Sequence, residues 1–235
     1  MEIKPILFST EMVKAILENR KTQTRRINPD GSVITKPIME LYDSQSRTYG
    51  IETYQDKHYT EKVCCVEAPV PVCPGDILWV RETWTSEAGR YYYRADFESD
   101  FLDPCETLSG GYPGSCIRKD CNFCQAQPER ICWRPSIHMP KKAARLFLHI
   151  CGCRTERLNV ITMEDIIAEG IIFKMKEPLC WNHMTNLALG RIAFSEVWDK
   201  TIREDKIPIH GWKANPWVWV YSFERIEKPK DWPNI

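Results

Sequence analysis

The feature that most constrains this fold is a pair of long segments in which two kinds of side chain alternate: apolar with polar over much of the first, and aromatic with smaller residues over most of the second. One runs over residues 143–158 and the other over residues 217–226. Alternation over so many positions is typical of a β-strand whose two faces have different surroundings. Residues 77–84 begin with an uninterrupted apolar run, which predicts a central strand. The sequence therefore predicts a sheet whose strands lie far apart along the chain.

Three other segments predict helices. Residues 11–19 and residues 187–198 place apolar side chains at spacings of three and four, which gives each helix one apolar face. A third helix begins after the hydroxyl cap of Thr162, carries Asp165 in its first turn and ends at Gly170. This combination of strands and helices predicts an α+β fold.

A basic run follows the first helix, with no acid to interrupt it. Residues 19–26 hold four cations and two hydroxyls. Basic residues at the C-terminal end of a helix favour its dipole, so the run is as consistent with that role as with anion binding. If the chain is extended here, Lys21 and Thr24 can share a site, and an amine beside a hydroxyl can activate a weak oxygen nucleophile. Arg25 and Arg26 would then supply positive potential for a phosphate or an oxyanion.

Three segments together resemble the ASCH domain of the PUA-like superfamily, and they occur in the matching order. They are residues 16–26, which contain Arg20-Lys21-Thr22-x-Thr24-x-Arg26, residues 74–82 and residues 164–170. Residues 133–140 and 215–220 are similar to the larger phage and prophage-type members. The resemblance implies a PUA-like small β-barrel flanked by helices, in a superfamily associated with RNA and nucleotide handling.

The resemblance extends over most of the chain and implies a single domain over residues 1–235. The chain is long for one small barrel and short for two full domains, so one domain with insertions is the simplest organisation. One insertion covers about residues 28–73, where short mixed runs predict one or two β-hairpins. The other covers about residues 97–132 and is a Cys-rich loop.

Small bacterial ASCH members hydrolyse the acyl amide of N4-acetylcytidine with a lysine, a threonine and a glutamate. Matched motif by motif, these are Lys21 as base, Thr24 as nucleophile and Glu169. Glu169 lies in the last turn of its helix, where the dipole disfavours a carboxylate, so it either pairs with Lys21 or is an exposed helix-end acid. Burial lowers and a carboxylate raises the pKa of a lysine, and the sequence leaves that balance open. The alternative function is a non-catalytic module that binds RNA or a modified nucleotide.

Seven residues are candidates for binding a nucleotide or another anion: Arg20, Arg25, Arg26, Glu82, Tyr93, Arg134 and His138. Glu82 either points into the pocket or pairs with Arg81 or Arg94 as a strand-end carboxylate. Tyr93 ends a run of three tyrosines, of which at least one faces away from a core. It either stacks on a base or lies at a rim without a ligand.

Arg134 and His138 belong to a proline-bearing segment, residues 133–140. Each residue before a proline is held out of the helical region, so an extended segment is expected. Arg134 would hold either a phosphate or a carboxylate. His138 would be a general acid, a zinc ligand or a hydrogen-bonded packing residue.

The chain has 11 cysteines, and five of them lie in the second insertion. An odd count disfavours a complete set of disulfides, and clustered thiols in a reducing compartment tend to bind metal. Cys121 and Cys124 have the C-x-x-C spacing that aims two thiolates at one tetrahedral ion. A structural zinc site would add Cys116 and Cys132, with Cys105 as the alternative ligand. Reduced thiols or one local disulfide are equally open, and no organic cofactor is expected.

Charge and hydropathy narrow the class of partner. The formal net charge is zero, so the chain lacks the basic excess of sequence-independent duplex binders, and contacts with nucleic acid would be local. No apolar run is long enough to cross a bilayer, and the N-terminus lacks the apolar core of a signal peptide. We therefore expect a cytoplasmic protein that takes a nucleoside or RNA ligand and does not enter membranes. The sequence carries no signal of oligomeric state.

Overall fold

The computed structural model describes residues 1–27, 36–43, 48–54, 63–69, 71–87, 89–97, 133–173 and 183–232. The chain divides into two compact units. Unit 1 comprises Met1–Glu2, Glu18–Ile77 and Leu148–Arg225, and unit 2 comprises Ile3–Leu17, Leu78–Phe147 and Ile226–Ile235. Each unit is described by itself below.

Five strands form the main sheet, in the order β1-β6-β9-β10-β2. Their bounds are Ile3–Leu7 for β1, Ile77–Arg81 for β6, Phe147–Arg157 for β9, Trp217–Ile226 for β10 and Gln23–Arg26 for β2. Within the part of the chain that the structure describes, this order is open and no closed barrel is found. The mixed α and β content agrees with the predicted α+β class.

The predicted long strands are present, with different limits. β10 occupies residues 217–226 as expected, whereas β9 begins at Phe147 because Lys141–Ala143 form a short 3-10 helix. The strand predicted over residues 77–84 divides: β6 ends at Arg81, and a separate hairpin begins at Trp84. That hairpin pairs β7 (Trp84–Glu87) with β8 (Arg90–Tyr93) in unit 2.

The first insertion contains a three-stranded antiparallel sheet in the order β3-β4-β5. Its strands are β3 (Lys36–Asp43), β4 (Thr48–Tyr54) and β5 (Val63–Pro69). Successive antiparallel strands are what the predicted hairpins require, so that prediction is confirmed.

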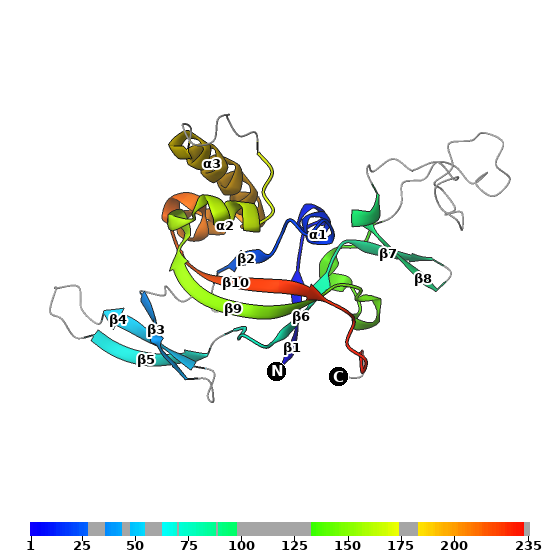
Figure 1. Ribbon diagram of the computed structural model, residues 1–235, viewed down its shortest axis with the longest axis horizontal. Helices are drawn as coiled ribbons and strands as arrows, with labels where there is room; N and C mark the ends of the chain where they lie inside the picture. The colour runs from blue at the N-terminus through cyan, green and yellow to red at the C-terminus, as the bar shows by residue number, and fades with distance from the viewer. Residues whose placement is uncertain are drawn as a thin grey trace. The chain divides into compact units, whose positions relative to one another are not determined.

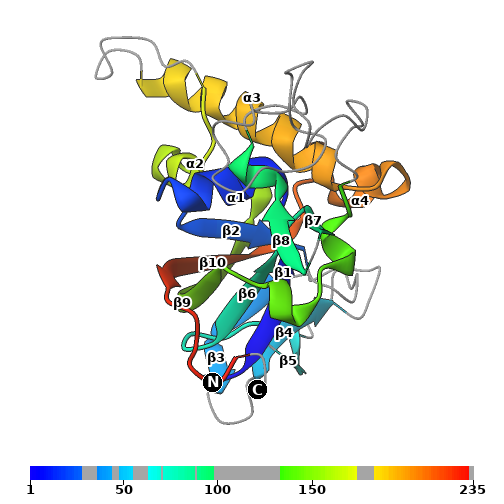
Figure 2. The same cartoon turned by 90° about the vertical axis from the view of Figure 1, so that its right-hand side faces the viewer.

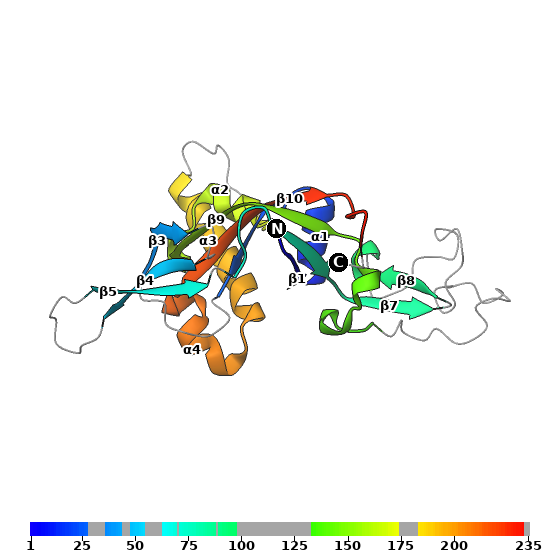
Figure 3. The same ribbon diagram turned by 90° about the horizontal axis from the view of Figure 1, so that it is seen from below.

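Unit 1 has its apolar core between β10 and two helices (Figures 1 and 2). Helices α2 (Met163–Ala168) and α3 (His183–Thr201) contact each other, and both lie on the same side of β10. The buried cluster joins residues of both helices to Val218 and Val220 of β10; its other members are Leu158, Ile161, Ile166, Phe194 and Trp198. Figure 3 shows the short helix α4 (Ile207–His210) following the end of α3.

Helix α2 begins and ends as its sequence predicts. The Thr162 hydroxyl accepts from the Asp165 backbone N–H at 3.2 Å, and the Asp165 carboxylate accepts in return from the Thr162 N–H at 3.3 Å, which is a capping box. The helix ends before Gly170, whose φ of 79° is in the left-handed region that favours glycine. Glu169 is therefore placed at the C-terminal end of α2.

Helix α1 (Thr10–Leu17) of unit 2 buries Val13, Ala15 and Ile16 and ends two residues before the predicted limit. In the same unit, the segment predicted to be extended forms a 3-10 turn at Ser136–His138, between Pro135 and Met139, which are extended. None of the helices in the described ranges is both long and apolar enough to cross a membrane.

Candidate functional site

Strand β2 carries the second half of the basic run and pairs with β10. In the antiparallel register, Arg25 lies opposite Val220 and Thr24 lies opposite Tyr221. Residues directly opposite each other share a face of the sheet, and neighbours along a strand alternate. Arg25 is therefore on the face of Val220, which α2 and α3 cover, whereas Thr24 is on the face of Tyr221.

Lys21 and Glu169 form a buried ion pair in unit 1. The Lys21 ammonium donates to Glu169 Oε2 at 2.6 Å and to the Glu169 carbonyl oxygen at 3.0 Å. The two residues are only 2% and 6% exposed, and an isolated antiparallel bridge joins their backbones. Burial lowers the pKa of Lys21, and the charges of Arg26 and Arg25 act in the same direction, although Glu169 opposes them. The net shift is downward, so burial outweighs the carboxylate.

Arg25 is surrounded by carboxylates on the helix-covered face. Its Nη1 donates to Glu169 Oε1 at 3.1 Å, its Nη2 is 3.0 Å from Asp165 Oδ2, and its Nε donates to Glu156 Oε1 at 3.1 Å. Its guanidinium also lies 5.9 Å from the centre of the Phe194 ring. The side chain is fully buried. Arg25 therefore ties β2 to both β9 and α2.

Arg154 completes this network from β9. It donates to Glu156 Oε2 at 3.1 Å and to Asp165 Oδ1 at 2.8 Å. Burial would raise the pKa of Asp165, but a hydrogen bond from Gln23 and the charge of Arg25 bring it below its usual range. We call Lys21, Arg25, Arg154, Glu156, Asp165 and Glu169 the unit 1 charge network.

Thr24 differs from its neighbours because its hydroxyl makes no hydrogen bond to a described residue. The residue is 1% exposed, and its Oγ1 has no hydrogen-bond partner among the described residues. Lys21 and Thr24 are therefore not hydrogen-bonded to each other. A buried hydroxyl without a partner is costly, so such a group is a candidate for contact with a ligand.

Arg20 and Arg26 also lie in unit 1. Arg20 donates to Glu18 Oε2 at 2.6 Å and to the Gly170 carbonyl at 2.9 Å. It lines a hollow of about 360 Å³ together with Asn19, Thr22, Ile167 and Ile171. Arg26 donates to the Arg25 carbonyl at 3.2 Å, and burial lowers its pKa. The structure thus places Arg20, Arg25 and Arg26 in the same unit as Lys21, Thr24 and Glu169.

Glu82 and Tyr93 lie in unit 2 and are held by a residue that the sequence did not indicate. Arg145 donates from Nε to Glu82 Oε1 at 2.8 Å and from Nη2 to Glu82 Oε2 at 2.9 Å, and it also pairs with Asp96 at 2.8 Å. The expected partners of Glu82, Arg81 and Arg94, are replaced by Arg145. We call Arg145, Glu82, Asp96 and Tyr93 the unit 2 charge network.

Burial raises the pKa of Glu82, although Arg145 acts against that shift. The Tyr93 hydroxyl donates to the Ala143 carbonyl at 2.6 Å, and the Arg145 guanidinium lies 4.0 Å from the centre of the Tyr93 ring. Burial raises the pKa of Tyr93 to about 12. Both candidates therefore have internal partners, and the alternative of a solvated Glu82 paired with Arg81 or Arg94 is wrong, because Glu82 is buried against Arg145.

Arg134 and His138 are exposed residues of unit 2. Arg134 exchanges two backbone hydrogen bonds with Trp84, at 2.7 and 3.2 Å, and its guanidinium lies 5.1 Å from the centre of the Trp84 ring. The His138 backbone N–H donates to the Pro135 carbonyl at 3.0 Å. The structure shows no ligand-directed contact for either side chain within its described ranges.

The proposed zinc ligands Cys116, Cys121, Cys124 and Cys132, and the alternative Cys105, lie outside the described residues. Three residues of the unit 1 network, Arg154, Glu156 and Asp165, were not site candidates. The alternation of β9 puts Arg154 and Glu156 on one face, a signal that the sequence carried. What the sequence did not show is which strand lies beside that face.

No family model, curated protein or solved structure matches this chain, so the function is inferred from its own residues.

Proposed function

We propose that unit 1 carries an amide-hydrolysis site acting on the acylated exocyclic amine of a nucleobase or nucleoside, in an ASCH-like domain with a PUA-like barrel. The observation that carries the proposal is the buried pair of Lys21 and Glu169, 2.6 Å apart, with the pKa of Lys21 lowered. An amine that loses its charge more readily than usual can serve as a general base. The Lys-x-x-Thr spacing and the position of Glu169 at the end of α2 are the features that resemble the ASCH amidohydrolases.

In the proposed reaction, Lys21 Nζ first loses the proton that it carries in the ion pair with Glu169, and Thr24 Oγ1 then attacks the acyl carbon while its own proton passes to Lys21 Nζ. The C–N bond then breaks as Lys21 returns that proton to the departing amine. Water hydrolyses the threonyl ester and releases the carboxylic acid. The buried Lys21 side chain has to leave Glu169 Oε2 to reach Thr24 Oγ1, and Glu169 positions the amine before and after that movement.

The unused hydroxyl of Thr24 permits a sharp test, which is hydrolysis of N4-acetylcytidine by the full chain and by Thr24→Val. Valine keeps the shape of threonine and removes only the hydroxyl, which makes no hydrogen bond among the described residues. We expect Thr24→Val to retain the fold and to lose turnover by about 10²-fold or more, since the nucleophile is absent. Thr85→Val is the matched control, because Thr85 is also buried but belongs to unit 2. Equal turnover in Thr24→Val and wild type would falsify the proposal.

A second candidate, non-catalytic recognition of RNA or a modified nucleotide, is favoured by the register of β2. Thr24 shares a face with Tyr221, whereas Arg25, which binds Glu169, is on the other face. A hydroxyl that faces away from the charge network would recognise a ligand without entering a reaction. Wild-type protein that binds N4-acetylcytidine, releases no acetate and binds more weakly as Thr24→Val would support this candidate over the enzyme.

A further inference from the structure

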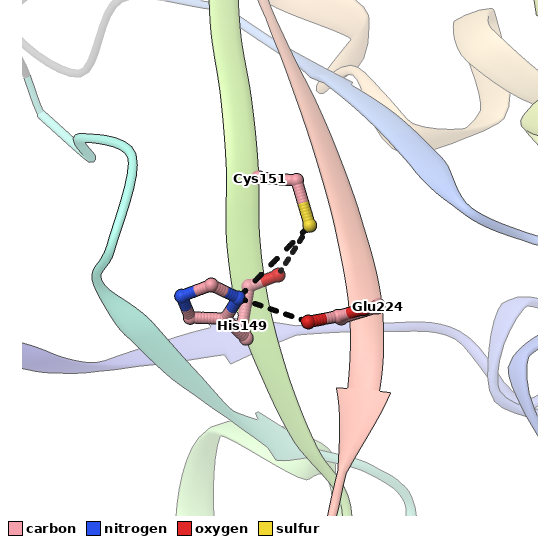
Figure 4. A group of neighbouring side chains, drawn as sticks. All are labelled: His149, Cys151 and Glu224. Carbon is pink, nitrogen blue, oxygen red and sulfur yellow. Dashed lines mark hydrogen bonds and ion pairs between the residues drawn. The ribbon is translucent and has the colours of Figure 1, made fainter.

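Three chemically different side chains meet on the exposed part of strands β9 and β10 in unit 1. His149 and Cys151 are two residues apart on β9, so both project from one face of the strand. Glu224 comes from β10, the neighbouring strand. Figure 4 shows one ring nitrogen of His149 facing both the Glu224 carboxylate and the Cys151 sulfur. The proposed hydrolysis site uses none of the three.

The two distances from the His149 nitrogen are close to those around a tetrahedral ion. His149 Nδ1 is 3.2 Å from Glu224 Oε1 and 4.0 Å from Cys151 Sγ, and all three ligand atoms lie within 4.8 Å of one another. Zinc bonds of about 2.0–2.1 Å to nitrogen, about 2.0–2.2 Å to oxygen and about 2.3 Å to sulfur would separate the nitrogen from the oxygen by about 3.4 Å and from the sulfur by about 3.6 Å. Side-chain adjustments of a few tenths of an ångström would bring the nitrogen to both distances.

The kinds of ligand select among metals. A set of one nitrogen, one sulfur and one oxygen is suited to Zn²⁺, whereas Ca²⁺ and Mg²⁺ require oxygen ligands. Cys151 would bind as the thiolate, with its proton released to solvent, and His149 would bind as the neutral imidazole. Three protein ligands leave a fourth position, which water can take because His149 and Glu224 have side chains 38% and 64% exposed.

We propose that His149, Cys151 and Glu224 form a surface site for Zn²⁺, with a fourth coordination position open to solvent or to an external ligand. Without metal, the same geometry is a contact of 3.2 Å between His149 Nδ1 and Glu224 Oε1 with a thiol beside it. The site does not depend on the proposed function of unit 1, and it uses none of the cysteines that the sequence analysis assigned to a zinc site.

Cobalt titration of the full chain under reducing conditions tests the proposal, because Co²⁺ takes the place of Zn²⁺ and a thiolate ligand gives a sulfur-to-cobalt absorption band. With 11 cysteines in the chain, the total number of ions bound decides nothing, so the readout is the difference between wild type and variants. We expect Cys151→Ser, His149→Ala and Glu224→Ala each to bind one fewer equivalent per chain than wild type. Excess Zn²⁺ should displace the cobalt from the wild-type site.

Cys153→Ser is the matched control. Cys153 is two residues further along β9 and does not belong to the cluster of His149, Cys151 and Glu224. This variant should bind as many equivalents as wild type. Equal binding by wild type and Cys151→Ser, or the same loss in Cys153→Ser as in Cys151→Ser, would overturn the assignment.

Discussion

Each of the two units places an arginine among carboxylates, and the two networks differ in which of their groups burial shifts and in what lies on the strand that carries them. In the unit 2 network, Arg145 makes a two-bonded contact with Glu82 and pairs with Asp96, and the Tyr93 hydroxyl has its own acceptor. In the unit 1 network, burial lowers the pKa of Lys21; on the other face of β2, the Thr24 hydroxyl has no partner among the described residues. A network that satisfies all its members rigidifies a fold, whereas an unused buried group leaves chemistry available to a ligand.

The largest expected difference between the units is in catalysis. Lys21→Met should reduce the hydrolysis of N4-acetylcytidine by about 10²–10⁴-fold, since the general base is removed. Lys141→Met, in unit 2, should leave turnover unchanged because Lys141 lies against the Trp232 ring and has no part in the proposed reaction. Steady-state kinetics of the two variants measure the difference. Comparable losses of turnover in both variants would contradict the assignment of catalysis to unit 1 alone.

The next difference is in stability. Arg25→Met should lower the free energy of unfolding by about 3–5 kcal/mol, because it leaves Glu156, Asp165 and Glu169 in a buried site without their shared cation. Arg145→Met should cost less, about 1–3 kcal/mol, because the Arg145 side chain is 26% exposed and water can replace part of its contacts. Urea unfolding gives both values. A larger loss in Arg145→Met than in Arg25→Met would contradict the comparison.

Acidification should also change the stability contributions of Asp165, in the unit 1 network, and Glu82, in the unit 2 network, in opposite directions. The folded-state pKa of Asp165 is lowered, so its contribution to stability is fully present above the unfolded value of 3.8 and is lost as the pH falls through the folded value. The pKa of Glu82 is raised, so its ionisation costs stability above the folded value, and this cost is absent below 4.5.

Unfolding free energies of Asp165→Asn, Glu82→Gln and wild type across the acidic range test this contrast. On acidification, the excess unfolding free energy of wild type over Asp165→Asn should shrink. The unfolding free energy of wild type should rise relative to that of Glu82→Gln. Parallel curves for all three proteins would show that neither carboxylate is shifted as inferred.

The smallest differences are expected from the two hydroxyls. Tyr93→Phe removes a hydrogen bond of 2.6 Å to Ala143 and should cost about 0.5–1.5 kcal/mol of unfolding free energy. Thr24→Val removes a buried hydroxyl that bonds to no described residue and should be neutral or slightly stabilising. Thermal or urea unfolding measures both. A cost in Thr24→Val equal to that in Tyr93→Phe would mean that the Thr24 hydroxyl has a structural role.

Some of the fold was readable from local patterns. The limits of β10 and the cap and end of α2 were predictable because strand alternation and helix capping depend on residues a few positions apart. The division of the strand predicted over residues 77–84 was not. Its end alternates as a strand can, and only the hairpin formed by Trp84 and its partners shows where the first strand ends.

The candidate site shows the same limit on what local sequence patterns can predict. Lys21 and Glu169 were singled out through motifs, and their contact across 148 positions in sequence is a property of the fold. The partner of Glu82 was wrongly limited to Arg81 and Arg94, since Arg145 approaches from 63 positions away. Sequence spacing cannot rank distant cations as partners, because the register between strands decides which side chains are adjacent.

The sequence by itself determined the limits of β10, the cap and end of α2, and the position of the basic run, because these follow from periodicity and local hydrogen bonding. Tertiary structure decided three further properties: that burial outweighs Glu169 in setting the pKa of Lys21, that Thr24 lies on the face of Tyr221, and that His149, Cys151 and Glu224 converge. Each depends on which distant segment packs alongside, and neither desolvation nor strand register is encoded in a short stretch of chain.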